Sequence, residues 1–318
     1  MSVPVDSVSA QRRLLLVHAH PDDETIGTGA TMAAYVAAGA QVTLVTCTLG
    51  EAGEILVPEL SQLEADQADQ LGGWRIGELA RAMAELGVTD HRFLGGAGRF
   101  RDSGMMGSAS NEKPRAFWRA NSDRVIFYDA VLALVEIIRE VRPQVVITYD
   151  DVGGYGHPDH IMAHRVTMAA VAASASVSGS TGFIRSGGAP WQVSKLYWTA
   201  MPRTVMAAGL QLLEQSPDSP FTAPDLLLEP PPVVEDHLVT TCIDAADFVK
   251  MKEAALAQHA TQVTVHGSFF ALSNNLGQLT SGVEYFRLIQ GEPGGPLDEY
   301  GRESDLFGGI DLTERASS

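Results

Sequence analysis

Two short segments of the chain concentrate side chains that could carry out hydrolytic chemistry. They hold five of the nine histidines: His18 and His20 in the first segment, and His157, His160 and His164 in the second. The first segment also carries two adjacent aspartates, Asp22 and Asp23, shortly after the aliphatic run LLLV (14–17). Imidazoles and carboxylates grouped in this way can bind a metal ion or transfer protons.

A metal ion accounts for both segments together. Two imidazoles and one carboxylate form a site that leaves positions for water and substrate, and His20, Asp23 and His160 would provide it. Asp22 would then lie beside the metal as a general base, and His157 as a general acid or oxyanion stabiliser. Spacing alone leaves open whether His157 or His160 is the ligand, and whether Asp22 or Asp23 is.

Simpler explanations apply to single residues of these segments. His18 at a strand end and His164, one helical turn too deep, are expected to be hydrogen-bonded structural residues. An aspartate before a helix is often only its cap. The stretch GTGATM (27–32) begins like a dinucleotide-binding fingerprint. Met32 occupies the position that requires Gly or Ala, and this disfavours a nucleotide site.

Both segments follow predicted β-strands in a chain that alternates strands and helices. The expected strands are 13–17, 41–46, 91–94, 145–149, 195–200 and 237–243. The expected helices are 26–38, 62–86, 125–142, 157–172, 204–213 and 246–259. This alternation predicts a three-layer, Rossmann-like α/β fold with a mostly parallel sheet. Ligands bind beyond the carboxyl ends of strands in such sheets, so we expect the two segments to face one another.

The chain contains no convincing linker, and we predict one domain over residues 1–318. Its core would be 13–175, with 190–290 packed on it and 291–318 as a loosely ordered tail. The aperiodic stretch 95–124 is expected to form a functional loop beside the substrate.

Composition excludes several classes of partner. The formal net charge is -17, from 39 acidic and 22 basic residues. Such a charge disfavours nucleic acids and anionic membranes, and leaves a small molecule as the expected partner. Two cysteines without metal-like spacing fit a reducing compartment. With neither a signal peptide nor a long apolar run, the expected location is the cytoplasm.

Several motifs resemble those of a known family. HAHPDDE (18–24) and HPDH (157–160) are similar to motifs of the zinc-dependent N-acetylglucosamine de-N-acetylases, the PIG-L/LmbE-like family. KEAALAQHATQ (252–262) is similar to a further family pattern. Five motifs resemble those of one branch of this family, which removes acetate from N-acetylglucosaminyl-inositol in mycothiol biosynthesis. They are TCTLGEAGE (46–54), ADQLGGWRIGEL (68–79), FLGGAGRFRDSGM (93–105), GGYGHPDH (153–160) and LSNN (272–275).

The resemblance implies one Zn²⁺ per chain and a role for each site residue. It implies His20, Asp23 and His160 as ligands, Asp22 as the general base, and His157 as the acid or intermediate-stabilising histidine. Further implied roles, by position, are an oxyanion contact for Tyr155, tuning of the site for Asp159, and contacts with sugar or inositol hydroxyls for Arg75 and Asp102. Without the resemblance, Arg75 on a helix reads as a solvated surface charge.

Other functions remain as alternatives. A mycothiol S-conjugate amidase would share the fold, the metal and the chemistry, and another N-acetylglucosaminide could be the substrate. Two histidines and a carboxylate also suit Fe(II) oxygenases, but those enzymes usually have double-stranded β scaffolds. A non-catalytic sugar-binding protein would not need the acid–base pair Asp22 and His157.

Overall fold

A seven-stranded sheet forms the centre of the structure, a computed structural model that describes residues 11–176, 188–223 and 232–312. Its strand order is β3-β2-β1-β4-β5-β10-β6. The strands from β3 to β5 are parallel, and β10 is antiparallel to both of its neighbours. The bounds are β1 Arg13–His18, β2 Gln41–Thr46, β3 Asp90–Phe93, β4 Val145–Thr148, β5 Lys195–Ala200, β6 Thr241–Asp244 and β10 Val283–Gln290.

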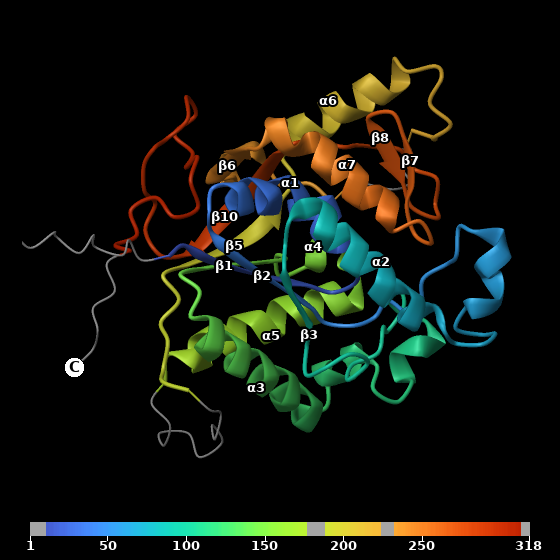
Figure 1. Cartoon of the computed structure of the whole chain (residues 1–318), viewed down its shortest axis with the longest axis horizontal. Coiled ribbons are helices and arrows are strands. Elements are labelled where there is room, and N and C mark those ends of the chain that lie inside the picture. The colour runs from blue at the N-terminus through green and yellow to red at the C-terminus, as the bar shows by residue number, and fades with distance from the viewer. Residues whose placement is uncertain (1–10, 177–187, 224–231, 313–318) are drawn as a thin grey trace, which may run out of the picture.

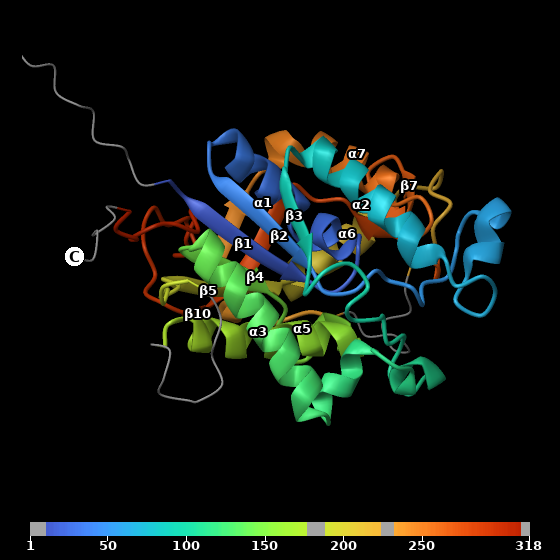
Figure 2. The ribbon, with the colours of Figure 1, turned by 60° about the horizontal axis from the view of Figure 1, so that its bottom comes forward.

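Helices cover both faces of this sheet. α1, α2 and α7 lie on one face and α3 and α5 on the other (Figure 1; Figure 2). Their bounds are α1 Asp23–Ala37, α2 Leu71–Leu86, α3 Arg124–Val141, α5 Pro158–Ser174 and α7 Val249–Gln258. The predicted three-layer α/β architecture is therefore confirmed. Among the helices of the described ranges, none has the length and apolar character needed to cross a bilayer.

The aliphatic side chains of β1 pack against the helices on both faces of the sheet. Leu15 and Val17 pack in the core shared with α3 and α5, whereas Leu14 and Leu16 pack in the core shared with α1 and α2. Successive side chains of a strand point to opposite faces, so a strand buried on both sides needs an apolar residue at every position. The sequence LLLV meets that requirement.

The direction of the chain across the sheet reverses beside β1. β2 and β3 follow on one side of β1, and β4 and β5 lie on the other side. The segments that leave the carboxyl ends of β1 and β4 therefore meet at a topological switch point, where open α/β sheets bind ligands.

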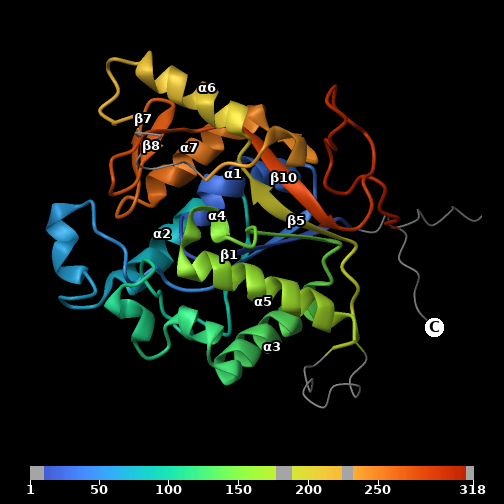
Figure 3. The ribbon, with the colours of Figure 1, turned by 180° about the vertical axis from the view of Figure 1, so that it is seen from behind.

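A smaller unit flanks the α7 layer. β7 (Thr264–His266), β8 (Phe269–Ala271) and β9 (Gln278–Leu279) form an antiparallel sheet, and α6 (Arg203–Glu214) packs against β9. Viewed from behind, α6 and this sheet lie beyond α7, away from α3 and α5 (Figure 3).

Two of the expected elements are corrected, and one strand of the central sheet was not expected. The helix expected over 62–86 begins only at Leu71, after a short 3₁₀ turn, because EADQADQ (64–70) supplies no leucine, valine or other large apolar side chain to pack. The strand expected over 237–243 is β6, Thr241–Asp244, and a 3₁₀ turn covers 236–238. The alternating sequence VEYFRLIQ, for which no element was predicted, forms β10.

The expectation of a loosely ordered tail is wrong for residues 291–312. Leu306 and Phe307 are buried in the core shared with α1 and α2. The Glu303 carboxylate, also buried, pairs with Lys195 and accepts hydrogen bonds from Tyr197 (3.0 Å) and Thr241 (3.1 Å). Apolar burial and a buried ion pair thus fix this segment on β5 and β6. The rest of the expected tail, 313–318, lies outside the described residues.

Candidate active site

The two histidine-bearing segments meet at the switch point, as the sequence predicted. His20, after β1, lies edge-on to His157, after β4, with ring centroids 4.6 Å apart. The His160 ring lies 5.3 Å from that of His20. All three side chains are buried, in a part of the molecule built from the loops after two neighbouring strands.

His20 has a different carboxylate on each ring nitrogen. Its Nε2 lies 3.1 Å from Asp159 Oδ2, and its Nδ1 lies 3.3 Å from Asp23 Oδ2. Asp159 is fully buried and also accepts hydrogen bonds from the backbone N–H and hydroxyl of Ser103. An Nε2–H donated to Asp159 leaves the lone pair of Nδ1 directed toward Asp23, the arrangement in which a carboxylate orients a metal-binding imidazole.

His160 provides the test of whether these residues fit a metal. Its Nε2 is buried, has no hydrogen-bond partner among the described residues, and lies 3.3 Å from Asp23 Oδ2. A buried ring nitrogen left without a partner is costly. Two imidazole nitrogens therefore flank one carboxylate oxygen of Asp23, a donor set that suits Zn²⁺.

By distance alone, two groups of donors in the described residues lie close enough to share an ion. They are His20 with His157 and His160, and His20 with Asp102 and Asp159; in each, one ligand atom per residue lies within 4.8 Å of the others, a criterion that the set of His20, Asp23 and His160 does not meet. The described part of the chain thus contains a buried His/Asp cluster centred on His20 that could hold a metal.

Asp22 has a strained backbone in this cluster. Its φ of 125° is rarely adopted by residues with a side chain. Its N–H donates to Glu24 Oε2 (2.9 Å), and its Oδ2 accepts from Arg75 Nη2 (3.1 Å). Burial raises the pKa of Asp22 to about 6, although Arg75 acts to lower it. The carboxyl group can thus take up and release a proton near neutral pH.

His157 caps the helix that carries His160. Its Nδ1 accepts the N–H of Asp159 (3.1 Å), so a proton on the neutral ring must be on Nε2. Burial, with His20 and His160 alongside, lowers the pKa of His157 to about 3. The imidazole is therefore neutral and offers an Nε2–H.

Tyr155 is the exposed member of the predicted set. Its side chain is 52% exposed, and its ring meets that of His160 edge-on at 4.9 Å. It lies in the short helical turn α4 (Gly153–Gly156), which contains glycines with positive φ. Tyr155 thus lies beside the histidine cluster with room to contact a ligand.

Arg75 is not a solvated surface charge, so the interpretation from its helical position alone is wrong. It is only 3% exposed, and its guanidinium donates to the carbonyls of Gly50 (2.8 Å) and Pro21 as well as to Asp22. A Cβ at position 50 would lie 2.0 Å from Arg75 Nη1, so this close approach requires the glycine. Arg75 reaches the cluster because α2 packs against α1.

Asp102 is also buried among protein contacts. Its carboxylate accepts the N–H groups of Ala52 (3.0 Å) and Gly104 (2.8 Å), and Oδ1 lies 3.5 Å from His20 Nε2. Burial acts to raise its pKa, but His20, His157 and the Gly104 N–H lower it below the usual range. Asp102 places the 95–124 stretch against the histidine cluster.

His18 and His164 are hydrogen-bonded to the protein, as expected for structural histidines, and both contact Tyr149. His18 Nδ1 lies 3.2 Å from the Tyr149 hydroxyl, and His164 Nδ1 lies 3.0 Å from the Tyr149 carbonyl. The other nitrogen of His18 bonds to Thr28 Oγ1, whose own proton goes to the Glu24 carbonyl. His18 Nδ1 therefore accepts, and the Tyr149 hydroxyl can donate to it.

The role of Tyr149 was not predicted from any motif or spacing. Its ring stacks on His160, with centroids 4.3 Å apart, and its hydroxyl accepts the N–H of Ala19 (2.9 Å). One side chain thus connects the loop after β1 to the helix that carries His160. Its position directly after β4 was the only available signal.

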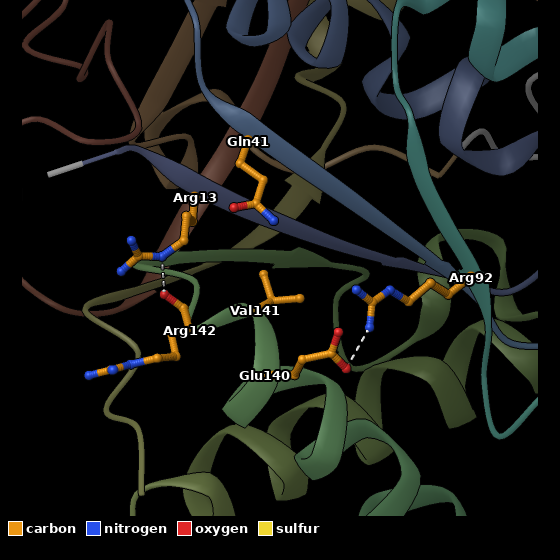
Figure 4. Close-up of a pocket in the computed structure, with 6 residues that line it drawn as sticks. All are labelled: Arg13, Gln41, Arg92, Glu140, Val141 and Arg142. Carbon is orange, nitrogen blue, oxygen red and sulfur yellow. Dashed lines mark hydrogen bonds and ion pairs between the residues drawn. The ribbon is translucent and has the colours of Figure 1, made fainter. Parts of the chain in front are cut away.

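A second group of charged residues lies at the amino ends of β1 and β2. It surrounds a cavity of about 280 Å³, lined by Arg13, Gln41, Arg92, Glu140, Val141 and Arg142 (Figure 4). Arg92 pairs with Glu140 at 2.9 Å, and the Arg13 guanidinium donates to the Arg142 carbonyl at 2.7 Å. None of the predicted site residues lines this cavity.

Comparison with known proteins relates the chain to deacetylases. A family model described as PIG-L: GlcNAc-PI de-N-acetylase matches residues 15–171. The chain is 57% identical over 304 residues to the 1D-myo-inositol 2-acetamido-2-deoxy-alpha-D-glucopyranoside deacetylase of Geodermatophilus obscurus, covering 95% of this chain and 99% of the relative. It is 56% identical to the protein of that name from Acidothermus cellulolyticus, over 95% of this chain and 97% of the relative.

The fold is also similar to that of a solved structure. The N,N'-diacetylchitobiose deacetylase of Pyrococcus horikoshii superposes with a TM-score of 0.53 at 17% identity, covering 87% of this chain and 84% of that one. At this identity the similarity concerns the fold alone.

Proposed function

The chain belongs to the PIG-L family of de-N-acetylases, and from this membership we propose that it hydrolyses the acetamide of 1D-myo-inositol 2-acetamido-2-deoxy-α-D-glucopyranoside. The products are acetate and glucosaminyl-inositol, an intermediate of mycothiol biosynthesis. The proposal depends most on the close relatives, which carry this name and match nearly the whole chain. The buried His/Asp cluster supplies the chemistry that such a hydrolysis needs.

We propose a single Zn²⁺ held by His20 Nδ1, Asp23 Oδ2 and His160 Nε2. Asp23 Oδ2 lies 3.3 Å from each of the two nitrogens, and His160 Nε2 has no other partner in the described ranges. Asp23 Oδ2 also accepts the His20 backbone N–H (2.8 Å). Asp102 and Asp159 are weaker candidates because both carboxylate oxygens of each accept hydrogen bonds from N–H or O–H groups of the protein. When bound, zinc polarises a carbonyl and lowers the pKa of water toward ~7.

Asp22 serves as the proton acceptor in this proposal. It removes a proton from the attacking water as the new C–O bond forms. Because burial raises its pKa to about 6, the protonated carboxyl can then return that proton to the departing amine. The C–N bond breaks, and acetate and the free amine result.

His157 and Tyr155 stabilise the negative charge on the substrate oxygen. The pKa of His157, lowered to about 3, makes a cationic acid less suitable than a neutral Nε2–H donor. This favours the second of the two roles considered for His157. The exposed Tyr155 hydroxyl donates to the same oxygen, and Asp159 fixes His20 through Nε2.

We predict that Arg75 and Asp102 contact hydroxyl groups on the sugar or inositol ring of the substrate. Both side chains are bonded within the protein, so substrate contact would require them to share or exchange a partner. If Arg75 acts through Asp22, Arg75→Ala lowers kcat. If it binds the sugar, Arg75→Ala mainly raises KM.

The test is to measure zinc content and acetate release from N-acetylglucosaminyl-inositol with the purified protein. We expect about one zinc per chain and acetate release that stops when a chelator removes the metal. A mycothiol S-conjugate serves as the competing substrate. Cleavage of the conjugate without acetate release would make the chain an amidase, and full activity after metal removal would overturn the zinc assignment.

A further inference from the structure

The backbone of Asp22 must be held in place by its surroundings. A residue with a side chain at a φ of 125° is strained and persists only where neighbouring groups fix it. Asp22 is the N-cap of α1 and makes no side-chain capping bond. Its carbonyl accepts the N–H groups of Thr25 (3.0 Å) and Ile26 (2.9 Å), so the helix holds only that part of the residue. The contacts that fix its N–H and its side chain come from elsewhere.

One of these contacts leads from the Asp22 backbone to the last third of the chain. The Asp22 N–H donates to Glu24 Oε2 at 2.9 Å. The other carboxylate oxygen, Glu24 Oε1, lies 3.0 Å from His259 Nε2. Both side chains are 0% exposed, so water does not compete for this pair. Since Glu24 Oε1 can only accept, His259 Nε2 donates.

His259 is held by the packing of α7. It directly follows this helix, which packs against α1 and α2 (Figure 1). Its second ring nitrogen, Nδ1, is buried without a hydrogen-bond partner among the described residues. Burying an imidazole that is satisfied on one side only costs stability, which a purely apolar residue here would avoid. The bond from Nε2 to Glu24 is thus the feature that the imidazole adds.

We propose that His259 is a positioning residue for deacetylation. By fixing the Glu24 carboxylate, it holds the backbone of Asp22 in its strained conformation and keeps the Asp22 carboxylate beside the histidine cluster. Arg75 fixes the Asp22 side chain from α2, so α2 and α7 hold the same residue by different atoms. The proposal rests on the role of Asp22 as the base in the proposed function.

A merely structural role for His259 predicts a different result. As a buried link between α7 and α1, it would affect the free energy of unfolding but not the chemical step in protein that remains folded. A positioning role predicts a loss in kcat at unchanged zinc content and nearly unchanged KM. A displacement of about 1 Å at a reacting group can lower a rate about 100-fold.

The experiment compares two variants of similar polarity with a matched control. His259→Gln keeps an N–H that can reach Glu24, whereas the shorter His259→Asn cannot. Thr261→Val is the control, because it removes a buried hydrogen bond to Glu78 two residues away without touching Glu24. For each variant we measure zinc content, kcat and KM, and the exchange rate of the Asp22 amide proton by NMR.

We expect His259→Asn to lose about 10- to 100-fold in kcat and to exchange the Asp22 amide faster, with zinc retained. His259→Gln should recover most of both properties, and Thr261→Val should match the wild type. Wild-type kcat and slow Asp22 exchange in His259→Asn would overturn the proposal. If His259→Asn does not fold, His259→Leu tests the same expectation, and rapid exchange of the Asp22 amide in the wild type would also contradict it. A wild-type protein without deacetylase activity would contradict the proposed function instead.

Discussion

The carboxyl edge and the amino edge of the central sheet both collect charged side chains. At the carboxyl edge, His20, Asp102 and Asp159 are 8%, 4% and 0% exposed. Beside the amino ends of β1 and β2, the Glu140 side chain is 66% exposed and pairs with Arg92 of β3, which is 28% exposed; both line an open cavity (Figure 4). Ionisable side chains thus gather in two regions of the sheet with different surroundings.

The difference shows that burial with incomplete pairing marks a reactive site better than charge density does. Arg92 and Glu140 satisfy one another at the surface, where water can replace either partner. His160 Nε2 is buried without a hydrogen-bond partner in the described part of the chain, with only the Asp23 carboxylate nearby at 3.3 Å, and Asp22 is buried with a raised pKa. The charge and bonding of such buried groups change strongly when a ligand, a metal ion or a proton binds.

The strongest test of this comparison is His160→Ala. Removal of a proposed ligand should abolish stoichiometric zinc binding and lower kcat/KM by about 1,000-fold or more, since a metal supplies several kcal/mol of transition-state stabilisation. His164→Asn is the control, because it changes a buried histidine one turn along the same helix. Metal analysis and acetate release check both variants, and normal zinc content in His160→Ala would contradict the assignment.

Asp22→Asn should have the next largest effect. We expect zinc to be retained and kcat to fall by about 100-fold or more, the usual contribution of a general base. In the wild type, Asp22 becomes protonated as the pH falls through about 6, so kcat/KM should decline below that pH. The pH–rate profile of the variant should lack this acid limb. Loss of zinc from Asp22→Asn would instead identify Asp22 as a ligand.

Tyr149→Phe should have an intermediate effect on the metal. The ring stack on His160 would remain, but the hydroxyl that joins the loop after β1 would be lost. We expect zinc affinity to fall by about 10-fold, as is common when an outer partner of a metal ligand is removed. Tyr197→Phe is the matched control, since it removes a buried hydroxyl bonded to Glu303. Chelator competition measures the affinity, and equal values for both variants would argue against a role of Tyr149 at the metal.

Glu140→Gln at the amino edge should have the smallest effect. The exposed pair with Arg92 contributes at most about 0–1 kcal/mol, and Arg92 keeps its second partner, Asp90. Denaturant unfolding should therefore show little change, and kcat and zinc content should be those of the wild type. A clear loss of activity would show that the amino edge also contributes to function, and the contrast between the edges would fail.

Sequence patterns predicted the elements that depend on local periodicity. The bounds of β2 and β5 and the carboxyl end of α2 agree with expectation, where an aliphatic run or Gly87 marks them. The meeting of the two histidine segments followed from strand order, because parallel strands end at the same edge. The burial of Arg75, the stack of Tyr149 on His160 and the bond between Glu24 and His259 were not predictable in this way. They depend on which helices pack together over long sequence separations.

The order of strands in the sheet has a consequence for synthesis of the chain. All proposed catalytic and ligand residues have been synthesised once the ribosome has added His160. β10, which lies between β5 and β6 in the sheet, is synthesised last of the seven strands. Until the ribosome has made Val283–Gln290, one edge of β5 has no partner, and unpaired edges are prone to aggregation. The catalytic segments are therefore present in an incomplete sheet until β10 is made. A protein truncated before β10 should fold in low yield even though its active-site sequence is intact.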